Sequence, residues 1–179
     1  MFYLQLLVNS CSFLSTYIVF FENLFIFHLI SQVNYISYPY EWCFSALKHA
    51  ALTTLEIHKT AIEFGMGLKD ASAYNIQFRH GQPILIDSLS FETYHEGQPW
   101  IAYRQFCQHF LAPLALMSYK HVGTGQLARI YIDGVPLDLA SSLLPLRTQF
   151  KLSLQIHLHS HARLQRKFAT GDDNKLKRQ

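Results

Sequence analysis

Glycine is scarce in this chain: 179 residues include only 8 glycines, and none forms a glycine-rich turn after an apolar strand. A Rossmann-type site needs such a turn, because the backbone must approach the ligand closely. The nearest candidate, Gly123-Thr-Gly125, has no apolar strand before it. The sequence therefore argues against a Rossmann-type site, and it also has no glycine-rich phosphate loop before residue 65.

Cysteine is almost as scarce, with three residues that are far apart: Cys11, Cys43 and Cys107. Zinc sites and disulfide frameworks in small domains show paired or regularly spaced cysteines. Neither is indicated here, and the scattered thiols favour a reducing, cytoplasmic setting.

Charge is missing from residues 1–21. About 20 apolar residues are enough for a membrane helix, but this stretch contains several polar residues and has no basic region of the kind that begins a signal peptide. Three interpretations of the apolar N-terminal extension, residues 1–34, stay open. It is a non-native segment read from AT-rich sequence, a membrane or interfacial segment through residues 1–30, or part of the core.

Positive charge is concentrated at the other end. Residues 1–146 contain 7 Lys/Arg and 10 Asp/Glu, a net charge of −3, whereas residues 147–179 contain 8 and 2, a net charge of +6. Basic segments attract nucleic acid or anionic lipid. No aromatic residues alternate with these charges, so we expect no nucleic-acid partner. Residues 171–179 have the composition of a disordered basic tail.

Three polar residues form the most informative pattern that is present. Asp70 and Asn75 are five residues apart, and Asp87 follows twelve residues later. Kinase-like enzymes place a catalytic base and two Mg²⁺ ligands in this order, since carboxylate and amide oxygens suit that ion. The pattern predicts Asp70 as the base and Asn75 with Asp87 as metal ligands. Lys69, where kinases usually have Arg, is a candidate cofactor-binding residue. The plain alternative is that these residues only cap turns.

The surrounding segments predict how those residues are held. An apolar stripe (Phe44, Leu47, Ala51, Leu55 and Ile62, with His58) predicts a helix over 40–64, ended by Gly65 and Gly67. Residues 76–78 and 83–86 read as two strands joined by a turn at 79–82. Asp133-Gly134 predicts a second, hairpin-like turn between residues 130–132 and 135–137.

Four stretches carry a resemblance to a family: residues 36–42 (ISYPYEW), 67–78 (GLKDASAYNIQF), 86–92 (IDSLSFE) and 98–117 (QPWIAYRQFCQHFLAPLALM). They resemble bacterial class I SAM-dependent methyltransferases of a nodulation-protein-like type, over roughly residues 36–168. In that family such a region precedes a separate methyltransferase domain. The resemblance implies a transferase, with SAM as cofactor and the methyltransferase domain or another protein as partner. The SAM site itself is expected to be absent from this chain.

The expected fold is therefore α+β and mostly helical, the C-lobe-like half of a protein-kinase-like fold, over residues 35–170. Further helices are expected at 100–119, 137–144 and 149–170. His157, His159 and His161 would share one face of a strand, and His157 and His161 one face of a helix, so a metal site competes there with ordinary polar histidines. Three functions stay open: a kinase-like module of a truncated methyltransferase, inactive alone; an Mg²⁺-dependent small-molecule phosphotransferase; or a membrane-associated interaction protein.

Overall fold

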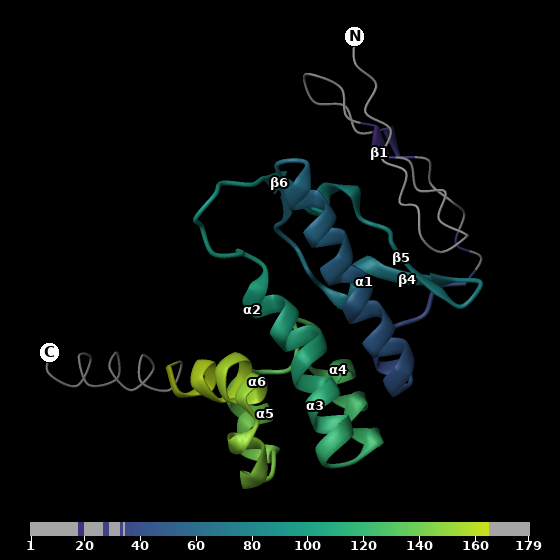
Figure 1. Cartoon of the computed structure of the whole chain (residues 1–179). Helices are drawn as coiled ribbons and strands as arrows, with labels where there is room; N and C mark the ends of the chain where they lie inside the picture. The colour runs from purple at the N-terminus through teal and green to yellow at the C-terminus, as the bar shows by residue number, and fades with distance from the viewer. Residues whose placement is uncertain (1–17, 20–26, 29–32, 34, 165–179) are drawn as a thin grey trace, which may run out of the picture.

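The computed structural model describes residues 18–19, 27–28, 33 and 35–164. It confirms a mostly helical α+β fold with short antiparallel strand pairs (Figure 1). In the N-terminal extension, β1 (Ile18–Val19) pairs with β2 (Phe27–His28). The rest of the predicted membrane segment, and all of the predicted tail at 171–179, lie outside the described residues. Among the helices that are described, none has both the length and the apolar character needed to cross a bilayer.

The first long helix, α1 (Phe44–Glu63), follows a 3₁₀ turn, η1 (Pro39–Glu41), and begins later than predicted. Its buried face is Leu47, Ala50, Ala51, Thr54 and Ala61. The predicted stripe was therefore partly wrong, because Phe44 and Leu55 are 37% and 40% exposed. Gly65 ends the helix with a positive φ of 71°, which glycine adopts without a steric penalty. Gly67 does not end it, because it lies in the next strand.

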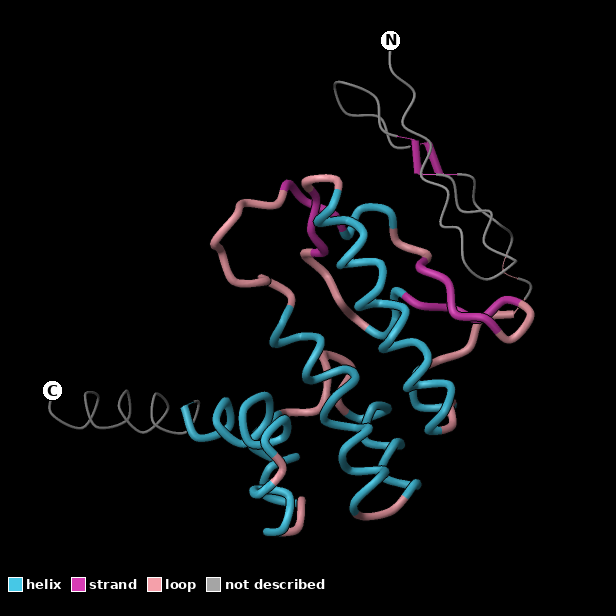
Figure 2. The backbone as a smooth tube through the Cα atoms, in the orientation of Figure 1, coloured by secondary structure: helices cyan, strands magenta, loops and turns pink. Residues whose placement is uncertain are grey.

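Two strand pairs follow α1 (Figure 2). β3 (Met66–Leu68) pairs antiparallel with β6 (Phe91–Thr93), which sequence reasoning did not predict. Between them, β4 (Ile76–Arg79) and β5 (Gln82–Leu85) form the predicted hairpin, in register from Ile76 opposite Leu85 to Arg79 opposite Gln82. The turn residues His80 and Gly81 both have positive φ, 50° and 76°, as a tight two-residue hairpin turn requires.

A continuous helical segment, the central helix, runs from α2 (Tyr103–Phe106) through η4 (Cys107–Leu111) to α3 (Ala112–Tyr119). It begins three residues later than predicted. Within η4 the backbone widens to a π-helix, and the Ala112 N–H donates to the Cys107 carbonyl. Pro113 follows immediately and has no N–H with which to close a regular turn. The proline thus gives a local reason for the widened turn.

The C-terminal part is helical and departs from one prediction. The expected hairpin at residues 130–137 is wrong: α4 (Leu127–Ile130) leads into a turn at Asp133-Gly134, and α5 (Leu137–Leu143) follows. The expected helix at 149–170 is described over residues 152–164, where α6 (Leu152–Leu154), the π-helix η7 (Gln155–Ser160) and residues 161–164 form one helical segment that begins three residues later than predicted. Two 3₁₀ helices complete this part of the chain: η5 (Val122–Gln126) before α4 and η6 (Leu146–Phe150) before α6.

The central helix lies between two hydrophobic clusters. On one face Phe110 and Met117 pack with α1 and the start of the β4–β5 hairpin. On the other face Cys107 and Leu116 pack with residues from α5, α6 and η7. Figure 1 shows this arrangement, with α1 on one side of the central helix and α5 and α6 on the other. The candidate site residues belong to the α1 side.

Candidate functional site

Asp70 lies in the loop between β3 and the 3₁₀ turn η2 (Ala73–Asn75), where two donors hold its carboxylate. Asp70 Oδ1 accepts hydrogen bonds from the Ser72 backbone N–H at 2.9 Å and from Gln105 Nε2 at 2.8 Å. Gln105 Oε1 in turn accepts from the Ala71 N–H at 2.8 Å. Gln105 belongs to α2, so one side chain of the central helix fixes both the loop backbone and its carboxylate. Sequence reasoning missed this residue, since its partners are more than 30 positions away.

Asn75 and Asp87 flank the open end of the β4–β5 hairpin, where the paired strands bring them together. The Ile86 N–H donates to the Asn75 carbonyl at 2.8 Å, which continues the hairpin ladder by one bond. Their side chains meet at Ser90: Asn75 Nδ2 lies 3.0 Å from Ser90 Oγ, and Ser90 Oγ lies 2.7 Å from Asp87 Oδ2. Asp87 also caps η3 (Ser88–Ser90), because its Oδ1 accepts from the Leu89 N–H at 2.9 Å. The capping role and the convergence of the two side chains therefore coexist.

Ser90 connects the two halves of the candidate site. Its backbone carbonyl accepts from the Lys69 N–H at 2.8 Å, next to Asp70, while its hydroxyl bridges Asn75 and Asp87. Ser90 is buried, with 1% of its surface exposed. The Lys69 side chain is exposed, so Lys69 contacts the site through its backbone N–H and not through its ammonium group. Ser90 is the second residue that sequence reasoning missed.

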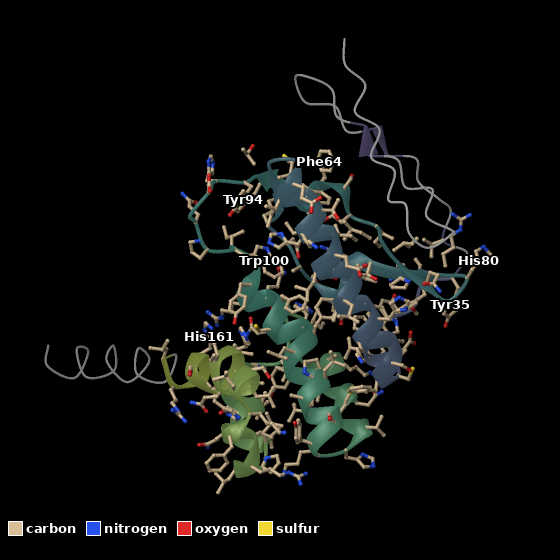
Figure 3. The ribbon with its side chains drawn as sticks, in the orientation of Figure 1. Tyr35, Phe64, His80, Tyr94, Trp100 and His161 are labelled. Carbon is tan, nitrogen blue, oxygen red and sulfur yellow. The ribbon has the colours of Figure 1, made fainter. Side chains whose placement is uncertain are left out.

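Two stacked aromatic rings anchor the end of strand β3 through the backbone of Leu68. The Leu68 N–H donates to His58 Nδ1 at 3.2 Å, and the Trp100 indole N–H donates to the Leu68 carbonyl at 2.6 Å. The two rings stack on each other with centroids 4.1 Å apart, and Figure 3 shows Trp100 between α1 and α2. Burial lowers the pKa of His58, which favours the neutral form that accepts the Leu68 bond.

A buried histidine lies near the Asp70 loop. His109, in η4, is 7% exposed, and the ring of Tyr74 packs edge-on against it at 6.2 Å. Burial lowers the pKa of His109 to about 4, and the charges of Asp70 and Asp133 oppose that shift only partly. The dependence on Asp70 shows that the loop carboxylate is electrostatically coupled to the central helix.

His157, His159 and His161 do not act as one group. His159 is buried and lies 2.8 Å from Ser141 Oγ and 3.0 Å from Thr148 Oγ1. His157 instead hydrogen-bonds Tyr103, and His161 packs against the same tyrosine ring at 5.3 Å. Within the described part of the chain, no group of three or more His, Cys, Asp or Glu side chains could hold a metal ion. The metal-site alternative for these three histidines therefore has no support in the described residues.

Comparison with known proteins gives one relationship to report. The chain is similar to the nodulation protein NoeA of Rhizobium meliloti (strain 1021), with 41% identity over 130 residues, which is 73% of this chain. The matched region is only 27% of the length of NoeA, so this chain spans about a quarter of that relative. No protein-family model and no solved structure matches the chain.

Proposed function

We propose that this chain is the kinase-like, Mg²⁺-binding module of a NoeA-like methyltransferase and that it has no methyltransferase activity on its own. The observation that carries the proposal is the convergence of Asn75 and Asp87 on Ser90, with Asp70 held nearby by Gln105. The similarity to NoeA and the resemblance to SAM-dependent methyltransferases supply the family context.

The donor set fits Mg²⁺. Each Asp87 oxygen accepts one hydrogen bond, which leaves each a further lone pair, and the Asn75 amide adds a neutral oxygen. Mg²⁺ is commonly held by one or two carboxylates, with waters and substrate phosphates completing its octahedron. When bound, the ion would neutralise negative charge on a phosphate-bearing ligand. The residues do not fit SAM in the same way, since Gly123 and Gly125 lie in the 3₁₀ helix η5 rather than in a strand-to-helix turn.

Asp70 is oriented to serve as a proton acceptor. Its Oδ1 already accepts two hydrogen bonds, and among the described residues no donor contacts Oδ2. A substrate hydroxyl would thus approach Oδ2, while Gln105 keeps the carboxylate from rotating. A base must lie within hydrogen-bond reach of the proton that it takes, so this fixed orientation is what the role requires.

The test of metal binding is the melting temperature of the full chain in MgCl₂, compared with NaCl at equal ionic strength. A ligand that binds only the native state stabilises it by about 1.4 kcal/mol at ten times its Kd, which raises the melting temperature by a few degrees. Asp87→Asn should remove the response while keeping the turn cap. Asp138→Asn, an exposed aspartate of α5, is the matched control and should respond like the unmodified chain. An unchanged melting temperature at 10 mM Mg²⁺ would remove the metal site from the proposal.

The SAM part of the proposal is tested by calorimetric titration of the chain with SAM. We expect no measurable heat of binding, because the described glycines form no turn that would let backbone approach the ligand. Binding at micromolar concentration would contradict this expectation and would require a different cofactor site.

A small-molecule phosphotransferase is the second candidate, and the uncontacted Oδ2 of Asp70 specifically favours it. Its test is release of ADP from Mg·ATP in the presence of small hydroxyl compounds, with Asp70→Asn as the inactive control. We expect no turnover by the isolated chain. Turnover that disappears in Asp70→Asn would make the phosphotransferase the better assignment.

A further inference from the structure

The Ser90 hydroxyl has one proton but two polar neighbours. Its Oγ lies 2.7 Å from Asp87 Oδ2 and 3.0 Å from Asn75 Nδ2. A hydroxyl donates one hydrogen bond and accepts up to two, whereas an ionised carboxylate only accepts. The proton must therefore point to Asp87, and the Ser90 oxygen must accept from Asn75.

This proton count decides which way the Asn75 amide faces. A flipped amide would place its carbonyl oxygen against a hydroxyl whose proton is already committed to Asp87, so two acceptors would repel each other. Amide orientation is assigned from such networks, and here the network allows one assignment. The Asn75 NH₂ group faces Ser90, and its Oδ1 is turned away from Ser90.

We propose that Ser90 is a positioning residue that presents the Asn75 Oδ1 atom and the Asp87 carboxylate to one and the same cation. This inference rests on the function proposed above and adds the residue that organises its metal site. Ser90 does not contact the ion. It acts through the two ligands, as the hydrogen-bond partners of metal ligands do in other sites.

The backbone around Ser90 suits it to this task. Its carbonyl is bonded to the Lys69 N–H across the β3–β6 pair, and the residue is 1% exposed, so the hydroxyl has little freedom to move. The Leu89 N–H holds the other Asp87 oxygen at 2.9 Å. Both candidate ligands are thus oriented before any ion arrives, which lowers the ordering cost of binding.

A metal-free measurement tests the orientation directly. The side-chain NH₂ signals of Asn75 are assigned by loss in Asn75→Ala, and their hydrogen exchange is followed by NMR in the full chain. In Ser90→Ala we expect exchange of these protons to accelerate at least tenfold. In Ser88→Ala, a serine of the same turn with no described side-chain hydrogen bond, we expect no change. Unchanged Asn75 exchange in a folded Ser90→Ala protein would overturn the inference, whatever Mg²⁺ does.

A Mg²⁺ titration then tests the consequence. Losing the hydrogen-bond partner of a metal ligand typically weakens metal affinity by about 10–100-fold, so the Mg²⁺ midpoint of Ser90→Ala should rise by that factor. Ser88→Ala should keep the midpoint of the unmodified chain. If Ser90→Ala does not fold, Ser90→Cys replaces it, because a thiol has a similar shape but its sulfur is a weak hydrogen-bond acceptor. The Mg²⁺ midpoint of Ser90→Cys should then also rise. An unaltered midpoint in the variant refutes the positioning role, whereas no Mg²⁺ response in the unmodified chain refutes the proposed function alone.

Discussion

Acid should destabilise this protein most strongly through the buried histidine His109. Burial lowers the pKa of His109 from its ordinary 6.5 to about 4 in the folded chain. As pH falls below 6.5, the unfolded chain binds a proton at this residue while the folded chain does not. The free energy of unfolding therefore has its full value above pH 6.5, decreases as pH falls toward 4, and levels off below that.

The size of the effect follows from the difference between the two pKa values. One pKa unit corresponds to about 1.4 kcal/mol, so His109 should account for a loss of about 3 kcal/mol between pH 6.5 and pH 4. Burial also lowers the pKa values of His58 and His159, so both add to the loss in the same direction. The part due to His109 is obtained as the difference between the unmodified chain and a His109→Gln variant.

The assay is urea unfolding at half-unit steps from pH 4.5 to pH 8, with NMR titration of the His109 ring. His109→Gln should flatten the pH dependence, whereas His95→Gln, at an exposed turn, should not. Because the Asp70 charge raises the pKa of His109, Asp70→Asn should lower it further. A His109 ring that titrates near 6.5 in the folded protein would refute the burial argument, and a pKa unaffected by Asp70→Asn would refute the proximity of the loop.

Three further substitutions, one of them with a matched glycine control, test other parts of the structure. Gln105→Ala removes both hydrogen bonds to the Asp70 loop; we expect about 1–2 kcal/mol lower stability by urea unfolding and faster hydrogen exchange in that loop, and unchanged exchange would exclude the clamp. Gly134→Ala would place a Cβ 2.6 Å from Gln108 Cβ at a φ of 94°. It should cost more than about 2 kcal/mol, whereas Gly97→Ala, with φ 82° and open space around it, should cost about 1 kcal/mol. Asp87→Ala removes the η3 cap and should lower the melting temperature by a few degrees, as a loss of about 1–2 kcal/mol implies.

Local signals were enough to predict the hairpin and the first helix. Two strand-like runs around a turn that contains Gly81 specify β4 and β5, because pairing and turn lie within ten residues. Helical spacing of apolar residues specified α1, and Gly65 specified its end. The proximity of Asn75 and Asp87 follows from this hairpin alone, since they flank it directly.

The rest of the arrangement depends on contacts that sequence spacing does not reveal. β3 and β6 are three residues each and are separated by the whole hairpin, so no local alternation marks them as partners. Gln105 and Ser90 carry no special pattern; their roles arise because the central helix and the end of η3 pack against the Asp70 loop. The predicted turn at Asp133-Gly134 was real, but the segment before it is helix α4, since a turn signal does not specify what it joins.

The position of Ser90 also bears on the proposed cation site. Ser90 forms hydrogen bonds with Lys69, Asn75 and Asp87, so the two candidate ligands, Asn75 and Asp87, are held in place. These two ligands offer few oxygen atoms, whereas Mg²⁺ takes six ligands. Phosphate or water would have to supply the remaining ligands of a bound Mg²⁺ ion. Since the matched region is 27% of NoeA, most of that relative lies outside the comparison. We therefore expect Mg²⁺ binding to be measurable in this chain by itself, and catalysis to require a second surface that holds the substrate.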